Sequence, residues 1–150
     1  TTALDVTIQA QILDLMKQLK DSLSTSIIII THDLGVVADI ADEIAVMYAG
    51  NVVEKGTCKE VFYNAKHPYT LGLLKSVPNP DNMEKERLQP IKGYPPDLMN
   101  LPEGCPFSAR CSKTMKICLK ADPKPRDVGN GHTVKCWLLE KEAHSKQKVI

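Results

Sequence analysis

The most distinctive hydrophobic pattern in the chain is residues 26–31, where four consecutive isoleucines lie between a serine and a threonine. A run of β-branched residues is typical of a strand buried on both faces of a parallel sheet. His32 follows it, and Asp33 is suited to cap a helix over residues 34–41. The pattern predicts a central strand, then a turn that carries an imidazole, then a helix. The turn would lie at the carboxyl edge of the sheet, which is where open α/β sheets bind ligands. By itself this pattern fits a hydrogen-bonded loop histidine slightly better than a site.

Helical periodicity precedes this run. Apolar side chains recur at positions 8, 12, 15, 16 and 19, which predicts an amphipathic helix of about four turns after a cap at Asp5 or Thr7. The polar segment 21–25 then connects this helix to the isoleucine run.

A hairpin and two helices are predicted beyond residue 42. Segments 43–49 and 52–56 have strand composition and flank Gly50-Asn51, which predicts an antiparallel pair with a tight turn. Thr57 is suited to cap a helix through Phe62. Pro68 begins a further helix that Pro78 and Pro80 end; its inward-facing residues are expected to be Leu71, Leu74 and Val77.

This order of elements indicates the end of an α/β domain. A strand of the four-isoleucine type needs neighbours on both sides, and the 150 residues supply none. The chain also begins at Thr1 without a methionine, so we expect it to be part of something longer. We predict three regions: the α/β portion at 1–77, a loop-rich extension at 78–139, and a disordered tail at 140–150.

Composition narrows the function little. The chain is 43% hydrophobic and 25% charged, with a formal net charge of +1. These values are those of an ordinary globular protein and give no argument for a nucleic-acid partner. No run is long and apolar enough to predict a membrane span, and no signal peptide is visible.

The loop-rich region carries four cysteines with the spacing C-x5-C-x6-C-x17-C. A short segment with little apolar core needs a staple. Disulfides are one possibility, although they are rare in reducing compartments; zinc is a second, although its ligands usually come in closely spaced pairs; an iron–sulfur cluster is a third. His132 is an alternative ligand, and Cys58 is expected to be a small buried side chain. The four candidate ligands are Cys105, Cys111, Cys118 and Cys136.

Several motifs together resemble the oligopeptide/dipeptide importer family of ABC-transporter ATPases. Residues 2–5 (TALD) resemble the D-loop, and residues 30–33 (ITHD) resemble the switch histidine segment. Residues 46–56 are similar to the strand pair that follows. The HPYT sequence at 67–70 and the cysteine-containing segment from Gly104 to Cys136 resemble the C-terminal extension of this family. The resemblance covers nearly the whole chain as far as Trp137.

The resemblance implies the C-terminal portion of a P-loop, ABC-type ATPase domain, which is α/β, followed by the cysteine-containing extension. It implies that His32 contacts the γ-phosphate of ATP or the attacking water, and that Leu4 and Asp5 lie at the nucleotide and dimer interface. The implied cofactors are ATP, Mg²⁺ and a 4Fe–4S cluster on the four cysteines, with zinc as the alternative. The implied partners are permease subunits and a second ATPase in a head-to-tail dimer, at the cytoplasmic side of a bacterial or archaeal membrane.

The 150 residues contain no G-x-x-x-x-G-K-S/T loop, no Q-loop, no LSGGQ-type signature and no Walker B carboxylate pair. We therefore predict that the chain alone has no ATPase activity and that its severed sheet makes it self-associate. Two alternatives stay open: a stand-alone metal- or iron–sulfur-binding regulatory or interaction module and, within the transporter resemblance, the ATPase of a nickel importer.

Overall fold

The structure is a computed structural model that describes residues 6–77 and 90–140. Contacts divide the chain into two compact units, Thr1–Ala41 and Asp42–Ile150. The regions predicted at 1–77, 78–139 and 140–150 stay predictions. Leu4, Asp5, Pro78, Pro80 and nearly all of the predicted tail lie outside the described residues.

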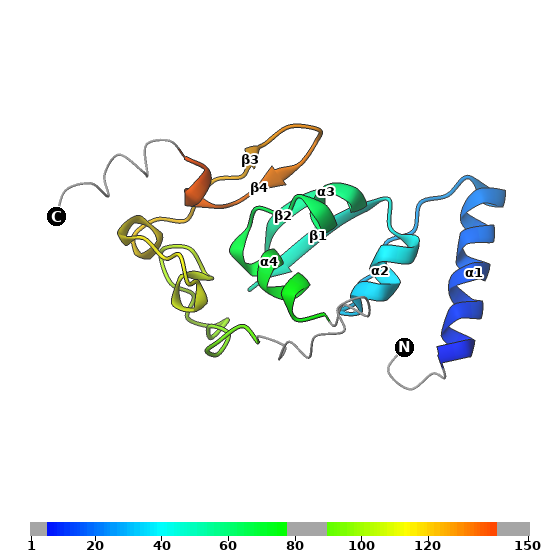
Figure 1. The fold of residues 1–150 in the computed structure, drawn as a ribbon, viewed down its shortest axis with the longest axis horizontal. Helices are drawn as coiled ribbons and strands as arrows, with labels where there is room; N and C mark the ends of the chain where they lie inside the picture. The colour runs from blue at the N-terminus through cyan, green and yellow to red at the C-terminus, as the bar shows by residue number, and fades with distance from the viewer. Residues whose placement is uncertain (1–5, 78–89, 141–150) are drawn as a thin grey trace, which may run out of the picture. The chain divides into compact units, whose positions relative to one another are not determined.

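The first unit contains two helices, α1 (Val6–Leu23) and α2 (Leu34–Ile40), which are labelled in Figure 1. Both were predicted from the sequence. The Asp33 carboxylate caps α2 because its Oδ1 accepts hydrogen bonds from the backbone N–H groups of Gly35 at 2.9 Å and Val36 at 3.2 Å. These two bonds satisfy donors that the first helical turn leaves without partners.

The predicted buried strand at residues 26–31 is wrong for this structure. The segment forms no strand, and Ile28 and Ile30 are 92% and 97% exposed. Ile27 and Ile29 are each 37% exposed, so the side chains alternate as they do in extended backbone. A strand also needs a hydrogen-bonded neighbour, and the described part of the chain provides none for this segment.

We expect this exposed isoleucine segment to cause the isolated chain to self-associate, because bare apolar residues in extended backbone favour pairing with another chain. Light scattering across a concentration series should show association. The double variant Ile28→Lys, Ile30→Lys should reduce it, whereas Leu23→Lys at the end of α1 should not. A wild-type chain that stays monomeric at high concentration would contradict this expectation.

The second unit begins with the predicted antiparallel hairpin of β1 (Glu43–Tyr48) and β2 (Asn51–Thr57). Its turn lies one residue earlier than predicted, at Ala49 and Gly50, which have φ values of 47° and 75°. Positive φ at both positions suits the twist of a two-residue hairpin loop. Asn51 is the first residue of β2, and its side chain stabilises the turn by donating to the Ala49 carbonyl at 3.1 Å.

Two short helices follow the hairpin, α3 (Cys58–Tyr63) and α4 (Pro68–Lys75). Thr57 caps α3 as predicted, accepting from the backbone N–H of Glu60 at 3.2 Å. Pro68 occupies the first turn of α4, as predicted, and the cap is His67. The fully buried side chain of α4 is Thr70, whereas its leucines are half-buried.

Residues far along the chain extend the hairpin into a four-stranded sheet. Strands β3 (Arg126–Asp127) and β4 (Thr133–Val134) pair with each other, and β4 pairs with β2, giving the antiparallel order β1-β2-β4-β3. The described unit is therefore a mixture of helices and antiparallel sheet. Three 3₁₀ helices complete it: η1 (Ser108–Arg110), η2 (Lys116–Leu119) and η3 (Trp137–Leu139).

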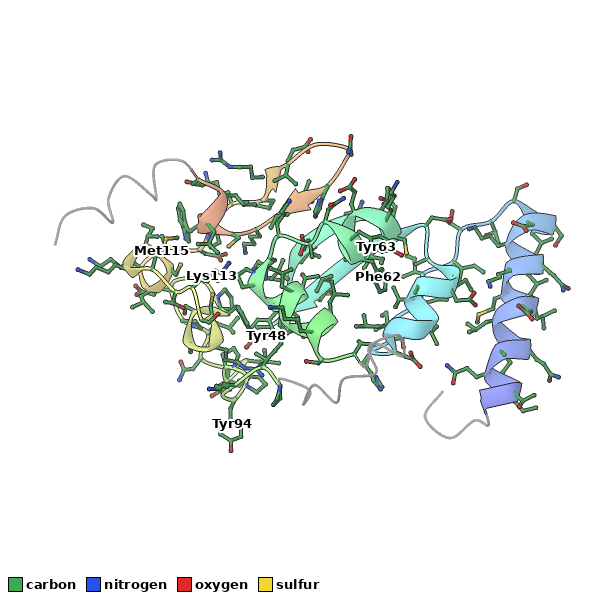
Figure 2. The ribbon with its side chains drawn as sticks, viewed as in Figure 1. Tyr48, Phe62, Tyr63, Tyr94, Lys113 and Met115 are labelled. Carbon is green, nitrogen blue, oxygen red and sulfur yellow. The ribbon has the colours of Figure 1, made fainter. Side chains whose placement is uncertain are left out.

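Aromatic side chains form the centre of this unit. The Tyr48 ring lies 4.7 Å from that of Tyr69 and 5.1 Å from that of Phe107, measured between centroids. Offset and edge-on contacts of this kind stabilise cores beyond their buried area. Figure 2 labels Tyr48 among the packed side chains and shows Tyr94, which is 92% exposed, pointing away from them. Among the described residues, no helix is both long and apolar enough to cross a membrane.

Candidate functional site

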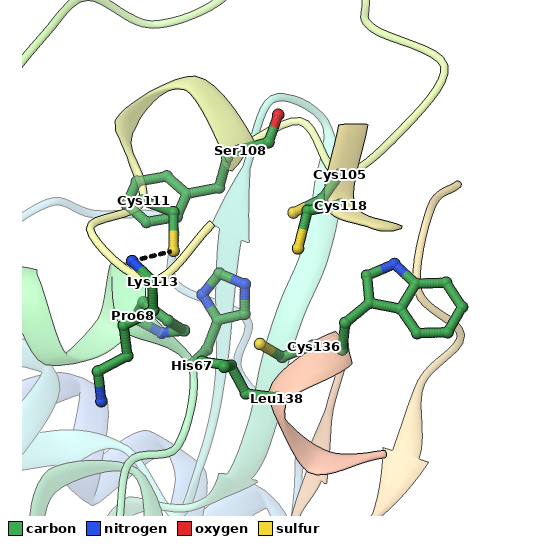
Figure 3. A pocket seen from close by; sticks show the side chains of 11 residues that line it. His67, Pro68, Cys105, Ser108, Cys111, Lys113, Cys118, Cys136 and Leu138 are labelled. Atoms are coloured by element: carbon green, nitrogen blue, oxygen red, sulfur yellow. Dashed lines mark hydrogen bonds between the residues drawn. The ribbon is translucent and has the colours of Figure 1, made fainter. Parts of the chain in front are cut away.

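The four predicted cysteines lie around one pocket in the second unit (Figure 3): Cys105 and Cys111 flank η1, Cys118 lies in η2, and Cys136 directly precedes η3. The space between atoms at this pocket amounts to about 290 Å³, a figure that includes open solvent, so the enclosed cavity is much smaller. All four thiols are free, so no disulfide joins them. The other lining side chains include His67, Phe107 and Trp137.

Each of these four sulfur atoms is close to a backbone N–H group. The amide of Lys113 donates to Cys111 Sγ at 3.4 Å, and that of Met115 donates to Cys118 Sγ at 3.5 Å. Backbone amides of Phe107 and Leu138 act in the same way on Cys105 and Cys136. Such donors stabilise negatively charged sulfur. Each of the four sulfur atoms therefore has one backbone donor that would stabilise it as a thiolate.

The electrostatics of the pocket are unfavourable to bare thiolates. Burial raises the pKa of the Cys136 thiol to about 11, against the opposing hydrogen bond from Leu138 and with a further increase from the other three cysteines. Burial also raises the pKa of Cys105. No cationic side chain appears among the causes that act on these two thiols. A bound cationic group would remove this penalty by stabilising the deprotonated sulfurs.

Close-set ligands for a single ion are not found here. In the ranges 6–77 and 90–140, no group of three or more His, Cys, Asp or Glu side chains is placed to hold a metal ion. The four sulfurs therefore surround a shared space without converging on one point.

His67 also lines the pocket, and the sequence interpretation had not identified it as a site residue. It is 1% exposed, and its Nδ1 accepts the backbone N–H of Tyr69 at 3.1 Å, which caps α4. Burial lowers the pKa of His67 to about 4, with the Glu54 charge opposing the effect, so the ring is neutral near pH 7. The sequence signal that could have located this cap is Pro68, which predicts that a helix begins there.

Behind the pocket, a buried carboxylate joins three segments of the unit. Glu54 on β2 is 1% exposed, and its Oε1 accepts the backbone N–H of Lys66 at 2.7 Å and the Nε2 of His132 at 2.8 Å. Its Oε2 accepts the backbone N–H of His67 at 3.2 Å. His132 is also 1% exposed. It is not among the residues that line the cysteine pocket, which argues against its alternative role as a metal ligand there.

His32 is the other predicted site residue that the structure describes, and it belongs to the first unit. His32 is exposed in the turn before α2, within the first unit. Its neighbours Thr31 and Asp33 shape that turn, because the Thr31 hydroxyl accepts the Asp33 N–H at 3.0 Å. Leu4 and Asp5 lie outside the described residues. Cys58 is half-buried at the start of α3, apart from the other cysteines.

Comparison with known proteins puts the HPYT segment and three of the four pocket cysteines within one matched family region. Residues 53–118 match the family model described as the oligopeptide/dipeptide transporter, C-terminal region. The chain is 54% identical over 143 residues to the dipeptide transport ATP-binding protein DppD of Bacillus subtilis, covering 95% of this chain and 42% of DppD. It is 56% identical over 143 residues to the oligopeptide transport ATP-binding protein OppD of the same organism, covering 95% of this chain and 40% of OppD.

Over most of its length the chain is similar to oligopeptide and dipeptide transport ATP-binding proteins. The OppD of Salmonella typhimurium is also similar, at 54% identity over 123 residues, covering 82% of this chain and 36% of that protein. This chain thus spans about two fifths of the length of the curated relatives that it matches.

The transporter family model covers only part of the site. Its range includes Glu54, His67 and the first three of the four pocket cysteines, whereas Cys136 and His132 lie beyond it. In the structure, strand β4 pairs with β2 and the loops that follow it place Cys136 at the pocket. The pocket is therefore assembled from the transporter C-terminal region and the segment that succeeds it.

Proposed function

We propose that this chain forms the C-terminal portion of the ATP-hydrolysing subunit that powers oligopeptide or dipeptide import through an ABC transporter. The observation that carries the proposal is the similarity to DppD and OppD over 143 residues, whose printed names describe dipeptide and oligopeptide transport ATP-binding proteins. The transporter match at residues 53–118 supports the same assignment.

Within the whole protein, His32 is the proposed catalytic residue of this portion. Its exposed position in the capped turn leaves the imidazole accessible to a nucleotide. There it would donate a hydrogen bond to the γ-phosphate or orient the attacking water, which stabilises charge on the transferring phosphoryl group. Leu4 and Asp5 would lie at the interface with a second ATPase subunit, and the remaining nucleotide and Mg²⁺ contacts would come from other parts of the protein.

The proposed partners are the permease subunits of the transporter and a second ATP-binding subunit in a head-to-tail dimer. The proposed location is peripheral, at the cytoplasmic side of the membrane. The relatives with transport ATP-binding names support these proposals, and the net charge of +1 gives no reason to add a nucleic-acid partner.

We further propose that the four cysteines of the pocket hold a 4Fe–4S cluster. A single zinc ion needs four ligands at about 2.0–2.3 Å from one point, and the described residues hold no such group. A cubic cluster instead takes one thiolate at each of four separate iron atoms, which suits four sulfurs placed around a shared space with backbone N–H donors beside them. Cys105, Cys111, Cys118 and Cys136 would hold it, and when bound it would cross-link the segments around η1, η2 and η3.

A chimaera tests the transport assignment. This chain should replace the corresponding segment of Bacillus subtilis DppD and restore dipeptide uptake and ATPase activity to a strain lacking DppD. His32→Ala in the chimaera should lower ATPase activity by at least about 100-fold, because it removes a donor to the transferring phosphoryl group. The matched control is Asp33→Asn, which keeps the cap of α2 and should retain most of the activity.

The isolated 150-residue chain should hydrolyse no ATP above a buffer blank, because it lacks the phosphate-binding loop. Turnover by the purified chain would refute this part of the proposal. A chimaera that folds and assembles without restoring uptake, or one in which His32→Ala retains full activity, would contradict the transport assignment or the role of His32, respectively.

A further inference from the structure

The imidazole of His67 has a fixed proton position, which the geometry of α4 determines. Its Nδ1 accepts the backbone N–H of Tyr69 at 3.1 Å and so presents a lone pair rather than a proton there. A ring with an unprotonated Nδ1 carries its proton on Nε2. The cap of the helix therefore makes Nε2 a hydrogen-bond donor.

The ring that carries this donor lines the cysteine pocket. His67 lines the pocket together with the four cysteines, and Figure 3 shows its ring among the sulfur atoms of Cys111, Cys118 and Cys136. No hydrogen bond joins Nε2 to another of the described residues. An acceptor inside the pocket would complete the hydrogen bonding of this nitrogen.

The same geometry argues against His67 as a fifth ligand. Coordination through Nε2 would need the lone pair of that nitrogen and would move the proton to Nδ1. A proton on Nδ1 would face the N–H of Tyr69 and break the cap of α4. Two further contacts restrict His67. Its backbone N–H donates to Glu54 Oε2 at 3.2 Å, and its ring centroid lies 5.8 Å from that of Phe107.

We propose that His67 is a positioning residue that donates a hydrogen bond from Nε2–H to a sulfur atom of the group held by the four cysteines. This inference rests on the proposed 4Fe–4S cluster. A hydrogen bond to sulfur stabilises the more negative, reduced form of such a cluster more than its oxidised form, and therefore raises the reduction potential. Glu54 and α4 fix the donor in place. The residues that position the HPYT segment would therefore also set the reduction potential of the cluster.

Two substitutions separate the two functions of the ring. In His67→Asn, the side-chain oxygen lies near the position of Nδ1 and can still cap α4, while the Nε2 donor is lost. In His67→Gln, the amide nitrogen reaches the position of Nε2 and keeps a donor, while the capping acceptor is displaced. If His67 only caps α4, His67→Gln should be the more damaging substitution. If His67 donates to sulfur, His67→Asn should change the cluster more.

The test is a reductive titration of the cluster in the anaerobically purified chain, followed by visible absorption and by EPR of the reduced form. His67→Asn should decrease the equilibrium constant for one-electron reduction about tenfold, which corresponds to a midpoint about 59 mV lower. His67→Gln should lie close to the wild type. Equal midpoints in all three proteins, or equal decreases in both variants, would overturn the role of His67 while leaving the cluster in place.

A wild-type chain without iron and acid-labile sulfide would instead overturn the cluster, and the hydrogen bond to it as well. A measurement on the wild type covers the case in which His67→Asn does not fold or does not retain its iron. With ¹⁵N-labelled histidine, pulsed EPR of the reduced cluster should show coupling to one imidazole nitrogen. Absence of this coupling would also overturn the proposal.

Discussion

Replacement of Glu54 by alanine should destabilise the second unit by about 3–5 kcal/mol, the largest effect that we expect from a single side chain. The carboxylate accepts two backbone N–H groups, from Lys66 and His67, and the Nε2 of His132. Its removal leaves all three donors buried without this acceptor. Urea unfolding followed by the fluorescence of Trp137, which is the single tryptophan of the chain, measures the change.

The control for Glu54 is another glutamate of the same hairpin. Glu43 on β1 pairs with Lys55 at 3.1 Å, but both side chains are more than half exposed, so Glu43→Ala should change stability by less than about 1 kcal/mol. Similar small losses in the two variants would show that the buried network around Glu54 contributes little, contrary to our account of how α4 and β4 are joined to β2.

Replacement of Gly104 by alanine should destabilise the same unit by about 3 kcal/mol or more, because the added methyl group meets rigid backbone. A Cβ at this position would lie 2.1 Å from the carbonyl oxygen of Cys118 and 2.8 Å from the carbonyl carbon of Leu119. The backbone would have to separate there, and the hydrogen bond from the Cys105 N–H to the Cys118 oxygen, now 2.8 Å long, would break. Two of the four pocket cysteines would then move apart.

Unfolding in urea and the iron content of the anaerobically purified protein both report on Gly104→Ala, and we expect both to decrease. Gly35→Ala is the control, since its Cβ would meet only the end of the Asp33 side chain at 3.2 Å and alanine favours the helix. Wild-type stability and iron content in Gly104→Ala would show that the close approach of these two loops is not required.

Local sequence features predicted the hairpin and helices well. The caps at Asp33 and Thr57 and the proline at the start of α4 each act within a few residues, so the sequence around them is sufficient. The isoleucine run failed as a strand because a strand depends on a neighbour that is distant in sequence. Strand β4 was missed for the same reason: its two residues, Thr133 and Val134, are defined by their pairing with β2.

The site, too, combines features that the local sequence predicts with features that depend on distant contacts. Spacing and composition identified the four cysteines as a set, and the structure brings them to one pocket. His67 was not identified because its position at the pocket depends on the packing of α4. Glu54 was also missed, because simple alternation would place either it or Val53 outside the core. The pairing of β1 with β2 shifts register opposite Val53, between Val46 and Met47, and both residues are buried. Irregularities of this kind re-aim side chains.

The central claim is that the four cysteines hold an iron–sulfur cluster, and the most direct test is iron and acid-labile sulfide analysis, with a visible spectrum, on anaerobically purified protein. Our account predicts about four of each per chain. Both should be lost together in Cys111→Ser and retained in Cys58→Ser, because Cys58 lies apart from the pocket. One zinc per chain, or no metal at all, would contradict it.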